Sequence, residues 1–212
     1  MSAYAAPVTL EGARLRLEPL AAAHADALEA LATDPELWRF TPTRIEDRAG
    51  LDAYIEAALA EQRAGGALPF ALVERAGSRA VGSTRLGHMD PEHERVEIGW
   101  TWVGRPFQRR GHGTESKLLL LSHAFETLGC RRVEFRVDAL NVPSRRAVAR
   151  LGAREEGTLR QHTRLPDGRF VDWVYSSILR KEWPAVRAAL RQRVAGRGPS
   201  GPAAEAPAGG AS

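Results

Sequence analysis

The sequence predicts an α/β fold, with strands and helices mixed in one domain that is large enough for a buried core. Three observations support this prediction. A strand-like run at 96–103 is followed by a glycine-rich loop and by a helix with an apolar side at 115–128. The next segment, 132–138, alternates in period two, as a half-buried strand does. Further along, Asp167-Gly168 separates two extended runs and predicts a β-hairpin.

Before the glycine-rich loop, the apolar pattern predicts a strand, two helices and two more strands. In this order they lie at about 15–18, 22–32, 46–63, 70–74 and 81–88. The first helix closes near Asp34-Pro35 and the second at Gly65-Gly66. The loop between these helices carries Trp38 and Phe40.

After 132–138, a helix follows Asn141-Val142-Pro143-Ser144 and runs to Leu151, where Gly152-Ala153 breaks it. The hairpin strands are predicted at 156–165 and 170–179, and a short helix at about 182–193.

These elements define an N-terminal extension at 1–10, one domain at 11–194 and a tail at 195–212. The tail consists mainly of Gly, Pro, Ala and Ser. Such a segment cannot bury enough apolar surface to offset the entropy lost on ordering. We therefore expect it to be disordered.

Composition is that of an ordinary soluble globular protein, with 43% hydrophobic and 26% charged residues. No run approaches the roughly 18 apolar residues of a membrane span, and residues 1–9 lack the features of a signal peptide. Cys130 is the single cysteine and is expected to be a small buried residue, so no intramolecular disulfide forms. We expect a cytoplasmic protein that does not contact membranes.

The net charge is +4 and the isoelectric point is about 9.8. Lys117 and Lys181 are the only lysines, so the excess is almost all arginine, scattered along the chain. Such charge is typical of a solvated surface, and it could also steer an anionic cofactor or an RNA-associated substrate. The sequence lacks the interleaved aromatic and basic strand motif of RNA-binding domains, so we expect no direct nucleic-acid partner.

The run from Gln108 to Thr114 joins the strand at 96–103 to the helix at 115–128. Its glycines let the backbone approach a ligand closely and adopt positive φ angles. Free N–H groups at the start of the helix then point at an anion, aided by the helix dipole. The run therefore predicts a site for a phosphate group.

Three kinds of glycine loop compete for this phosphate site. A Walker loop needs Gly-Lys followed by Ser or Thr, which the sequence lacks. A dinucleotide fingerprint needs a third glycine where Ser116 stands. The third pattern, Gln/Arg-x-x-Gly-x-Gly/Ala, is matched from Gln108 to Gly113.

This third pattern resembles the coenzyme A pyrophosphate loop of the GNAT superfamily of N-acetyltransferases. The surrounding motifs read Glu-Ile-Gly-Trp-Thr-Trp, Gln-x-x-Gly-x-Gly, Leu-Gly-x-x-Arg-Val, Asn-x-x-Ser, Leu-Gly-Ala and Glu-Gly. As a set, they resemble the RimJ/RimL-like branch from about Leu15 to Trp183. The resemblance implies a central mixed, mostly antiparallel twisted sheet of about seven strands, with helices on both faces and a splay between strands 4 and 5.

The resemblance also implies the reaction, which is acetyl transfer from acetyl-CoA directly to an amine in a ternary complex, without a metal. The acetyl-CoA-binding residues would be Trp102, Val103, Gln108, Arg109, Arg110, Gly111, His112, Gly113, Thr114, Asn141 and Ser144. The Val103 N–H is the simplest donor to the oxyanion. The side chain of His112 is expected to be a solvent-facing spacer within the loop.

Ser144 is the candidate that protonates the leaving thiolate, because related enzymes place a serine at this Asn-x-x-Ser position near the sulfur. Asn141 would bond the pantetheine arm or a nearby backbone group. Ser144 could equally be the N-cap of the following helix, a role that serine performs well, and both roles can hold at once.

The general base is open. Some relatives carry a glutamate in the segment after Glu-Gly, but by spacing that position here is Thr163, which cannot act as a base. His162 is one candidate, because histidine is a common general base, and the alternative for His162 is a half-exposed strand residue. Glu97 is the other, and the alternative for Glu97 is an ion pair with a neighbouring arginine.

The acceptor pocket is expected to draw on Trp38 and Phe40 and on the Asp167 hairpin, since aromatic side chains supply much contact area in such pockets. Trp100 and Trp102 alternate along their strand and more often indicate core. The acceptor is either a protein N-terminal α-amine or a small-molecule amine. A module that binds acyl-CoA or an amine without turnover is the alternative function. Dimers are common in this branch, but the sequence identifies no self-complementary surface.

Overall fold

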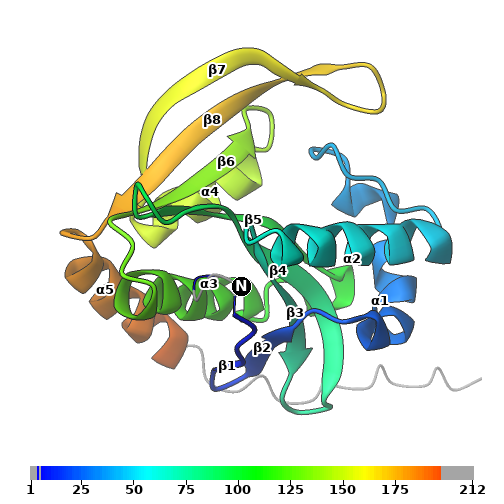
Figure 1. Cartoon of the computed structure of the whole chain (residues 1–212), viewed down its shortest axis with the longest axis horizontal. Helices are drawn as coiled ribbons and strands as arrows, with labels where there is room; N and C mark the ends of the chain where they lie inside the picture. The colour runs from blue at the N-terminus through cyan, green and yellow to red at the C-terminus, as the bar shows by residue number, and fades with distance from the viewer. Residues whose placement is uncertain (1–3, 5, 197–212) are drawn as a thin grey trace, which may run out of the picture.

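The computed structural model describes residue 4 and residues 6–196, which form one eight-stranded sheet with helices on both sides (Figure 1). Its strand order is β1-β2-β3-β4-β5-β6-β8-β7. The strands are β1 (Leu10–Glu11), β2 (Leu15–Pro19), β3 (Leu68–Glu74), β4 (Arg79–Asp90), β5 (Arg95–Val103), β6 (Arg132–Asp138), β7 (Arg154–Arg164) and β8 (Phe170–Leu179). All neighbours are antiparallel except β5 and β6, which are parallel.

This topology confirms the predicted mixed, mostly antiparallel sheet. The strand count exceeds the predicted one because β1, a two-residue edge strand, pairs with β2. The predicted tail started at Ala195, but this residue is the last of α5 and Gly196 is its C-cap. The rest of the tail, from 197 onward, lies outside the described residues.

The five α-helices divide between the two faces of the sheet. They are α1 (Ala25–Ala32), α2 (Arg48–Arg63), α3 (His112–Ser122), α4 (Val142–Leu151) and α5 (Trp183–Ala195). One apolar cluster joins α1 and α2 to one face, and a larger cluster joins α3, α4 and α5 to the other. The central strand β3 shows the division, because Phe70 and Leu72 enter the larger cluster while Ala71 and Val73 enter the smaller one.

The sheet splays open between β5 and β6. These strands pair only where Arg95–Glu97 meets Arg132–Glu134. Beyond that point β5 continues to pair with β4 as far as Val103, and β6 with β8 as far as Asp138. The facing edges of the two strands are therefore unpaired over their second halves, as the resemblance implied (Figure 1).

A β-bulge lies in β5 at the start of the splay. Ser83 pairs with Trp102 but Arg85 pairs with Gly99, so β5 has one residue more than β4 over this stretch. At the bulge, the backbone of Trp100 adopts the strained left-handed conformation, with φ of 50°. Bulges re-aim side chains next to active sites, and here Thr101 Oγ1 is brought within 2.7 Å of Thr84 Oγ1.

Glu115 in the first turn of α3 ties this helix to the turn between β1 and β2. Its side chain is only 2% exposed. Its carboxylate accepts hydrogen bonds from the backbone N–H groups of Ala13 and Arg14, the latter at 3.1 Å, and lies 4.0 Å from the Arg14 guanidinium. These contacts therefore hold the start of α3 against the edge of the sheet formed by β1 and β2.

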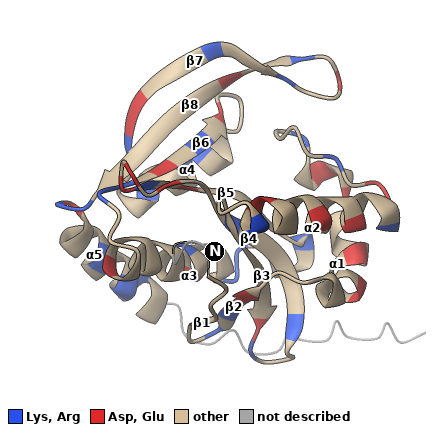
Figure 2. Cartoon of the chain, viewed as in Figure 1, with Lys and Arg blue, Asp and Glu red and all other residues tan. Residues whose placement is uncertain are grey.

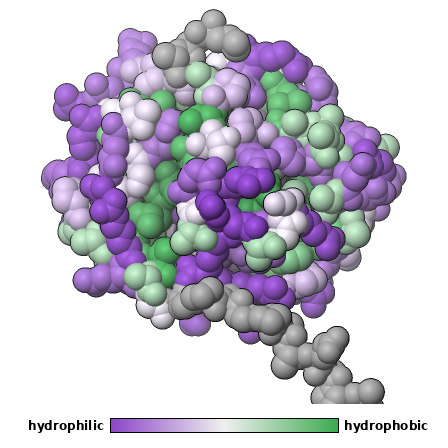
Figure 3. Space-filling view, turned by 90° about the horizontal axis from the view of Figure 1, so that it is seen from below, coloured by the Kyte–Doolittle hydropathy of each residue, from purple (hydrophilic) through white to green (hydrophobic). Residues whose placement is uncertain are grey.

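The surface agrees with the scattered charge seen in the sequence. In Figure 2 the Lys and Arg residues are spread over strands and helices and form no continuous patch in this view. Figure 3, seen from below, shows hydrophobic residues in separate patches between hydrophilic ones. Among the described residues, no helix is both long and apolar enough to span a bilayer.

Candidate active site

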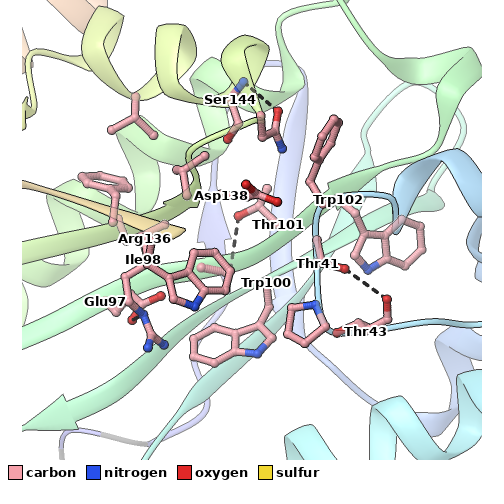
Figure 4. Close-up of a pocket in the computed structure, with 18 of the residues that line it drawn as sticks. Thr41, Thr43, Glu97, Ile98, Trp100, Thr101, Trp102, Arg136, Asp138 and Ser144 are labelled. Carbon is pink, nitrogen blue, oxygen red and sulfur yellow. Dashed lines mark hydrogen bonds and ion pairs between the residues drawn. The ribbon is translucent and has the colours of Figure 1, made fainter. Parts of the chain in front are cut away.

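A pocket of about 340 Å³ opens at the splay between β5 and β6 (Figure 4). Its walls come from the loop after α1, from α2, from β4, β5 and β6, from α3 and α4, and from the β7–β8 hairpin. Its volume is within the range of small-molecule sites, which is about 300–1,000 Å³. The sheet topology explains the position of the pocket, because the unpaired edges of β5 and β6 leave a gap between the two strands.

The glycine-rich loop lies between β5 and α3. Arg109 and Gly111 both adopt positive φ, at 62° and 95°, and α3 begins at His112. Within the described chain, no acceptor meets the backbone N–H groups of Arg109, Arg110 and Gly111. Successive free N–H groups with this alternating backbone make an anion-binding concavity at a helix N-terminus. The loop therefore has the geometry of a phosphate cradle.

The side chains of the loop fix it to its surroundings. The Gln108 amide donates a hydrogen bond of 2.9 Å to the Val103 carbonyl at the end of β5. The Arg110 guanidinium lies 5.3 Å from the centre of the Phe107 ring. The expectation that His112 faces solvent is wrong, because its side chain is only 3% exposed.

The two ring nitrogens of His112 explain this burial. Nδ1 lies 3.0 Å from the Phe107 carbonyl, and Nε2 lies 3.2 Å from Glu74 on β3. His112 thus joins the loop to the sheet, and the ring holds the first turn of α3 in place. The sequence hid this role because Glu74 is far away in the chain.

Val103 presents its backbone to the gap. The N–H of the next residue, Gly104, bonds to Val81 on the β4 side, and backbone groups alternate in direction along a strand. The N–H of Val103 therefore faces away from β4. The Trp102 carbonyl lies on the opposite side, against Gly82 of β4. Of the two strand residues predicted to bind through their backbone, Val103 has the suitable direction.

Asn141 and Ser144 both line the pocket, and Ser144 lies across it from β5 (Figure 4). Asn141 is the N-cap of α4, and its side-chain oxygen accepts a hydrogen bond of 3.1 Å from the Ser144 N–H. The cap role predicted as an alternative for Ser144 thus belongs to Asn141. The Ser144 hydroxyl makes no hydrogen bond within the described residues, so it is available to a ligand.

Glu97 lines the pocket but is already paired. Its side chain is about 5% exposed, and its Oε2 lies 2.6 Å from Arg136 Nε and 2.9 Å from His88 Nδ1. Arg136 comes from β6, at the point where β5 and β6 separate. The Glu97 carboxylate therefore forms an ion pair between β5 and β6 at the point where the two strands separate.

His162 and Thr163 take different positions on β7. The ring of His162 is exposed, with Nδ1 at 3.1 Å from Thr163 Oγ1, and it does not line the pocket. Thr163 does line the pocket and accepts a hydrogen bond of 2.8 Å from the Trp173 indole. A bulge between Leu159 and Thr163 accompanies φ of 50° at Gln161. The geometry gives no support to His162 as a base.

Aromatic side chains make the wall opposite α4. Trp38 and Phe40 both line the pocket, and the Trp38 indole donates a hydrogen bond of 2.6 Å to the Ala32 carbonyl. Trp100 and Trp102 line it as well. The core position that the sequence pattern favoured is confirmed for Trp102, while Trp100 is only half-buried. Trp102 is buried, packs edge-on against Trp38 and has no partner for its indole N–H within the described chain.

The family follows from this combination of fold, loop and pocket. The sequence matches the family described as Acetyltransferase (GNAT) domain over residues 14–154. The chain belongs to this family of acetyltransferases. It is therefore an acyltransferase, and the resemblance stated from its motifs is confirmed.

Relatives of this acetyltransferase are similar over most of its length. The uncharacterized N-acetyltransferase p20 of Bacillus licheniformis is 28% identical over 82% of this chain and 98% of its own length. A GCN5-related N-acetyltransferase structure from Brucella melitensis is 33% identical, with TM-score 0.80 over 89% of this chain and 86% of that one.

RimJ of Mycobacterium smegmatis, solved in complex with CoA-disulfide, is 26% identical to this acetyltransferase. Its TM-score is 0.77 over 91% of this chain and 97% of that one. This similarity supports the RimJ/RimL-like branch.

Three charged residues of the acetyltransferase pocket were not predicted from the sequence. Arg136 and Asp138 alternate along β6 and so share a face, while Lys117 projects from α3. Asp138 is buried and accepts hydrogen bonds from the Leu140 N–H and the Arg169 guanidinium, both at 2.9 Å. Both carboxylates of the pocket are thus paired with arginines.

Replacing Glu97 with Gln tests whether this paired carboxylate acts as a base. We expect kcat to change by less than about threefold, and the free energy of unfolding to fall by about 1–3 kcal/mol because the Arg136 pair is weakened. Steady-state kinetics and urea denaturation measure the two quantities. A tenfold or larger loss of kcat at unchanged stability would show instead that Glu97 removes the acceptor proton.

Proposed function

We propose that this acetyltransferase moves an acetyl group from acetyl-CoA directly to a primary amine in a ternary complex. The main support for this proposal is the unpaired edge of β5. This edge lies between the glycine-rich loop, with its free N–H groups, and the pocket that Ser144 lines. These features would hold the phosphates, the amide-rich arm and the thioester of one ligand along the same gap.

The residues present fit acetyl-CoA. The N–H groups from Arg109 to Gly111, with the N-terminus of α3, suit the pyrophosphate. The pantetheine arm carries amides, which suit the unpaired edge of β5. The Val103 N–H suits the negative charge that develops on the acyl oxygen. Ser144, on the opposite wall, would hold the sulfur through its free hydroxyl.

The acceptor must reach the pocket as a neutral amine, because only the neutral form attacks. An α-amino group has pKa of about 7.7–8.0, so roughly a seventh is neutral at pH 7. A lysine amine has pKa of about 10.4, so roughly one in a few thousand is neutral. The two pocket carboxylates, Glu97 and Asp138, are already engaged in ion pairs with arginines, so neither is free to take the acceptor proton. The site therefore favours protein N-terminal α-amines or small amines of low pKa.

Thiol release from acetyl-CoA across a panel of amines tests this function. The panel contains N-terminal peptides, free amino acids, polyamines and arylamines. Release with any member, with a matching acetylated product by mass, supports the proposal. Tight CoA binding without release from any amine would instead support the alternative of a binding module without turnover.

Replacing Ser144 with Ala is expected to lower kcat by about tenfold or more while changing the acetyl-CoA dissociation constant by less than threefold. The hydroxyl has no partner within the described part of the chain, so its loss leaves the Asn141 cap intact. Kinetics and calorimetry provide the two numbers. Thermal melting is the control and should be unchanged. Wild-type turnover in this variant would remove Ser144 from the chemistry.

A further inference from the structure

Lys117 is a lysine that points inward at the reaction chamber. It lies on α3, one turn beyond the glycine-rich loop, and lines the pocket. Its Nζ donates a hydrogen bond to Thr101 Oγ1, which lies at the β5 bulge and is itself 2.7 Å from Thr84 Oγ1. The bulge and the helix together hold this amine at the open edge of β5.

No carboxylate balances the charge of Lys117. Within the described residues, no Asp or Glu oxygen lies within 4.0 Å of its Nζ, in contrast to most arginines of the chain. The ionisable side chains that share the pocket are Tyr54 of α2, His88 of β4, Glu97 of β5, and Arg136 and Asp138 of β6. Both acids have arginine partners, so no carboxylate among the described residues compensates the charge of Lys117.

Resting on the function proposed above, we propose that Lys117 is the active-site cation of acyl transfer, balancing the charge on the departing sulfur and giving it a proton. A cation without a counter-ion stabilises negative charge that develops beside it. Acyl transfer from a thioester develops such charge, first on the acyl oxygen and then on the sulfur. Ser144 then orients the sulfur, and Lys117 supplies the charge and the proton.

The proton balance of this step closes without another reactant. The acceptor nitrogen bonds to the acyl carbon, the carbon–sulfur bond breaks, and its electron pair stays on sulfur. The Lys117 ammonium protonates that sulfur and becomes a neutral amine. The acceptor nitrogen loses one proton as it becomes an amide, and this proton restores the ammonium.

The acidity of Lys117 suits this transfer. Burial lowers its pKa to about 7, because desolvation penalises the ammonium form. A cysteine-like thiol has pKa of about 8.5, so a proton moves downhill from such an ammonium to a thiolate. An ordinary exposed lysine amine, with pKa of about 10.4, holds its proton too tightly for this step at neutral pH.

The two-lysine composition allows a direct test on the wild-type chain. Protein labelled with ¹³C at the lysine Cε gives two lysine signals, from Lys117 and Lys181, and the variant Lys181→Arg assigns them. We expect CoA to shift the Lys117 signal and leave the Lys181 signal in place. Desulfo-CoA, which lacks the sulfur, should shift Lys117 much less. Identical Lys117 signals in free and CoA-saturated protein would overturn the proposal.

Substitutions provide the kinetic half of the test. Lys117→Met is expected to lower kcat by about 100-fold with less than threefold change in the CoA dissociation constant. Lys117→Arg keeps the charge but cannot donate its proton at neutral pH, so its kcat should lie between the values of the wild type and of Lys117→Met. Lys181→Met is the matched control and should keep wild-type kcat.

The pH profile separates proton donation from support of the fold. With a saturating arylamine, which stays neutral throughout, wild-type kcat should fall as pH rises through the pKa of Lys117. Lys117→Met should lose this fall. A rate that rises over the same range in the wild type would contradict an acid. If CoA fails to bind or no amine releases thiol, the proposed function itself fails; normal turnover in Lys117→Met overturns only the role of Lys117.

Discussion

Replacing Gly111 with Glu is expected to weaken CoA binding by at least about 100-fold, or roughly 2.7 kcal/mol. Gly111 caps α3 with φ of 95° and carries one of the free N–H groups of the cradle. A side chain there strains the left-handed backbone by about 1–2 kcal/mol, and a carboxylate repels phosphate at the helix N-terminus. Calorimetry with CoA measures the loss.

A matched control for this variant exists far from the pocket. Gly65, just beyond α2, has φ of 81° and open space where a side chain would begin. Gly65→Glu therefore introduces similar backbone strain and the same charge, and should bind CoA like the wild type. Both variants should melt cooperatively. Unchanged CoA affinity in Gly111→Glu would remove the glycine-rich loop from the binding site.

The largest loss of stability is expected for Glu115→Ala, at about 3–5 kcal/mol. The substitution removes the carboxylate that accepts from the N–H groups of Ala13 and Arg14 and that lies beside the Arg14 guanidinium, while Glu115 itself is buried. For a chain of this size, the melting temperature should fall by roughly 10 °C. Circular dichroism and urea denaturation check both values.

Glu92→Ala is the control for the Glu115 variant. Glu92 is exposed and has no ion pair among the described residues, so its loss should change the free energy of unfolding by less than about 0.5 kcal/mol. If Glu115→Ala unfolds at the same denaturant concentration as the wild type, the link between α3 and the β1–β2 turn contributes nothing to stability.

The loop from Gln108 to Gly113 could be predicted because its function depends on local backbone. Glycine spacing, the preceding strand and the following helix are all consecutive in the sequence. The Asn141 and Ser144 pair was also visible, although the sequence could not decide which of the two caps α4. That choice depends on the backbone direction at the end of β6.

Other parts of the site depend on contacts that no local pattern records. The bulge in β5 adds one residue, so alternation alone did not show that Trp100 faces the pocket and is only half-buried. Lys117 lies on α3, and the sequence pattern of this helix does not show which of its sides faces the pocket. That depends on where β5 and β6 separate. His112 required knowledge of Glu74, which lies on another strand.

The short ladder between β5 and β6 links ligand occupancy to resistance against unfolding. Only three residue pairs join the two halves of the sheet, so a molecule that bonds along the open edge of β5 acts as a missing strand. A ligand at 100 times its dissociation constant adds about 2.7 kcal/mol to the folded state. Melting temperatures measured with acyl-CoA derivatives of different length would thus rank how strongly each derivative binds along the open edge of β5. This measurement needs no acceptor amine.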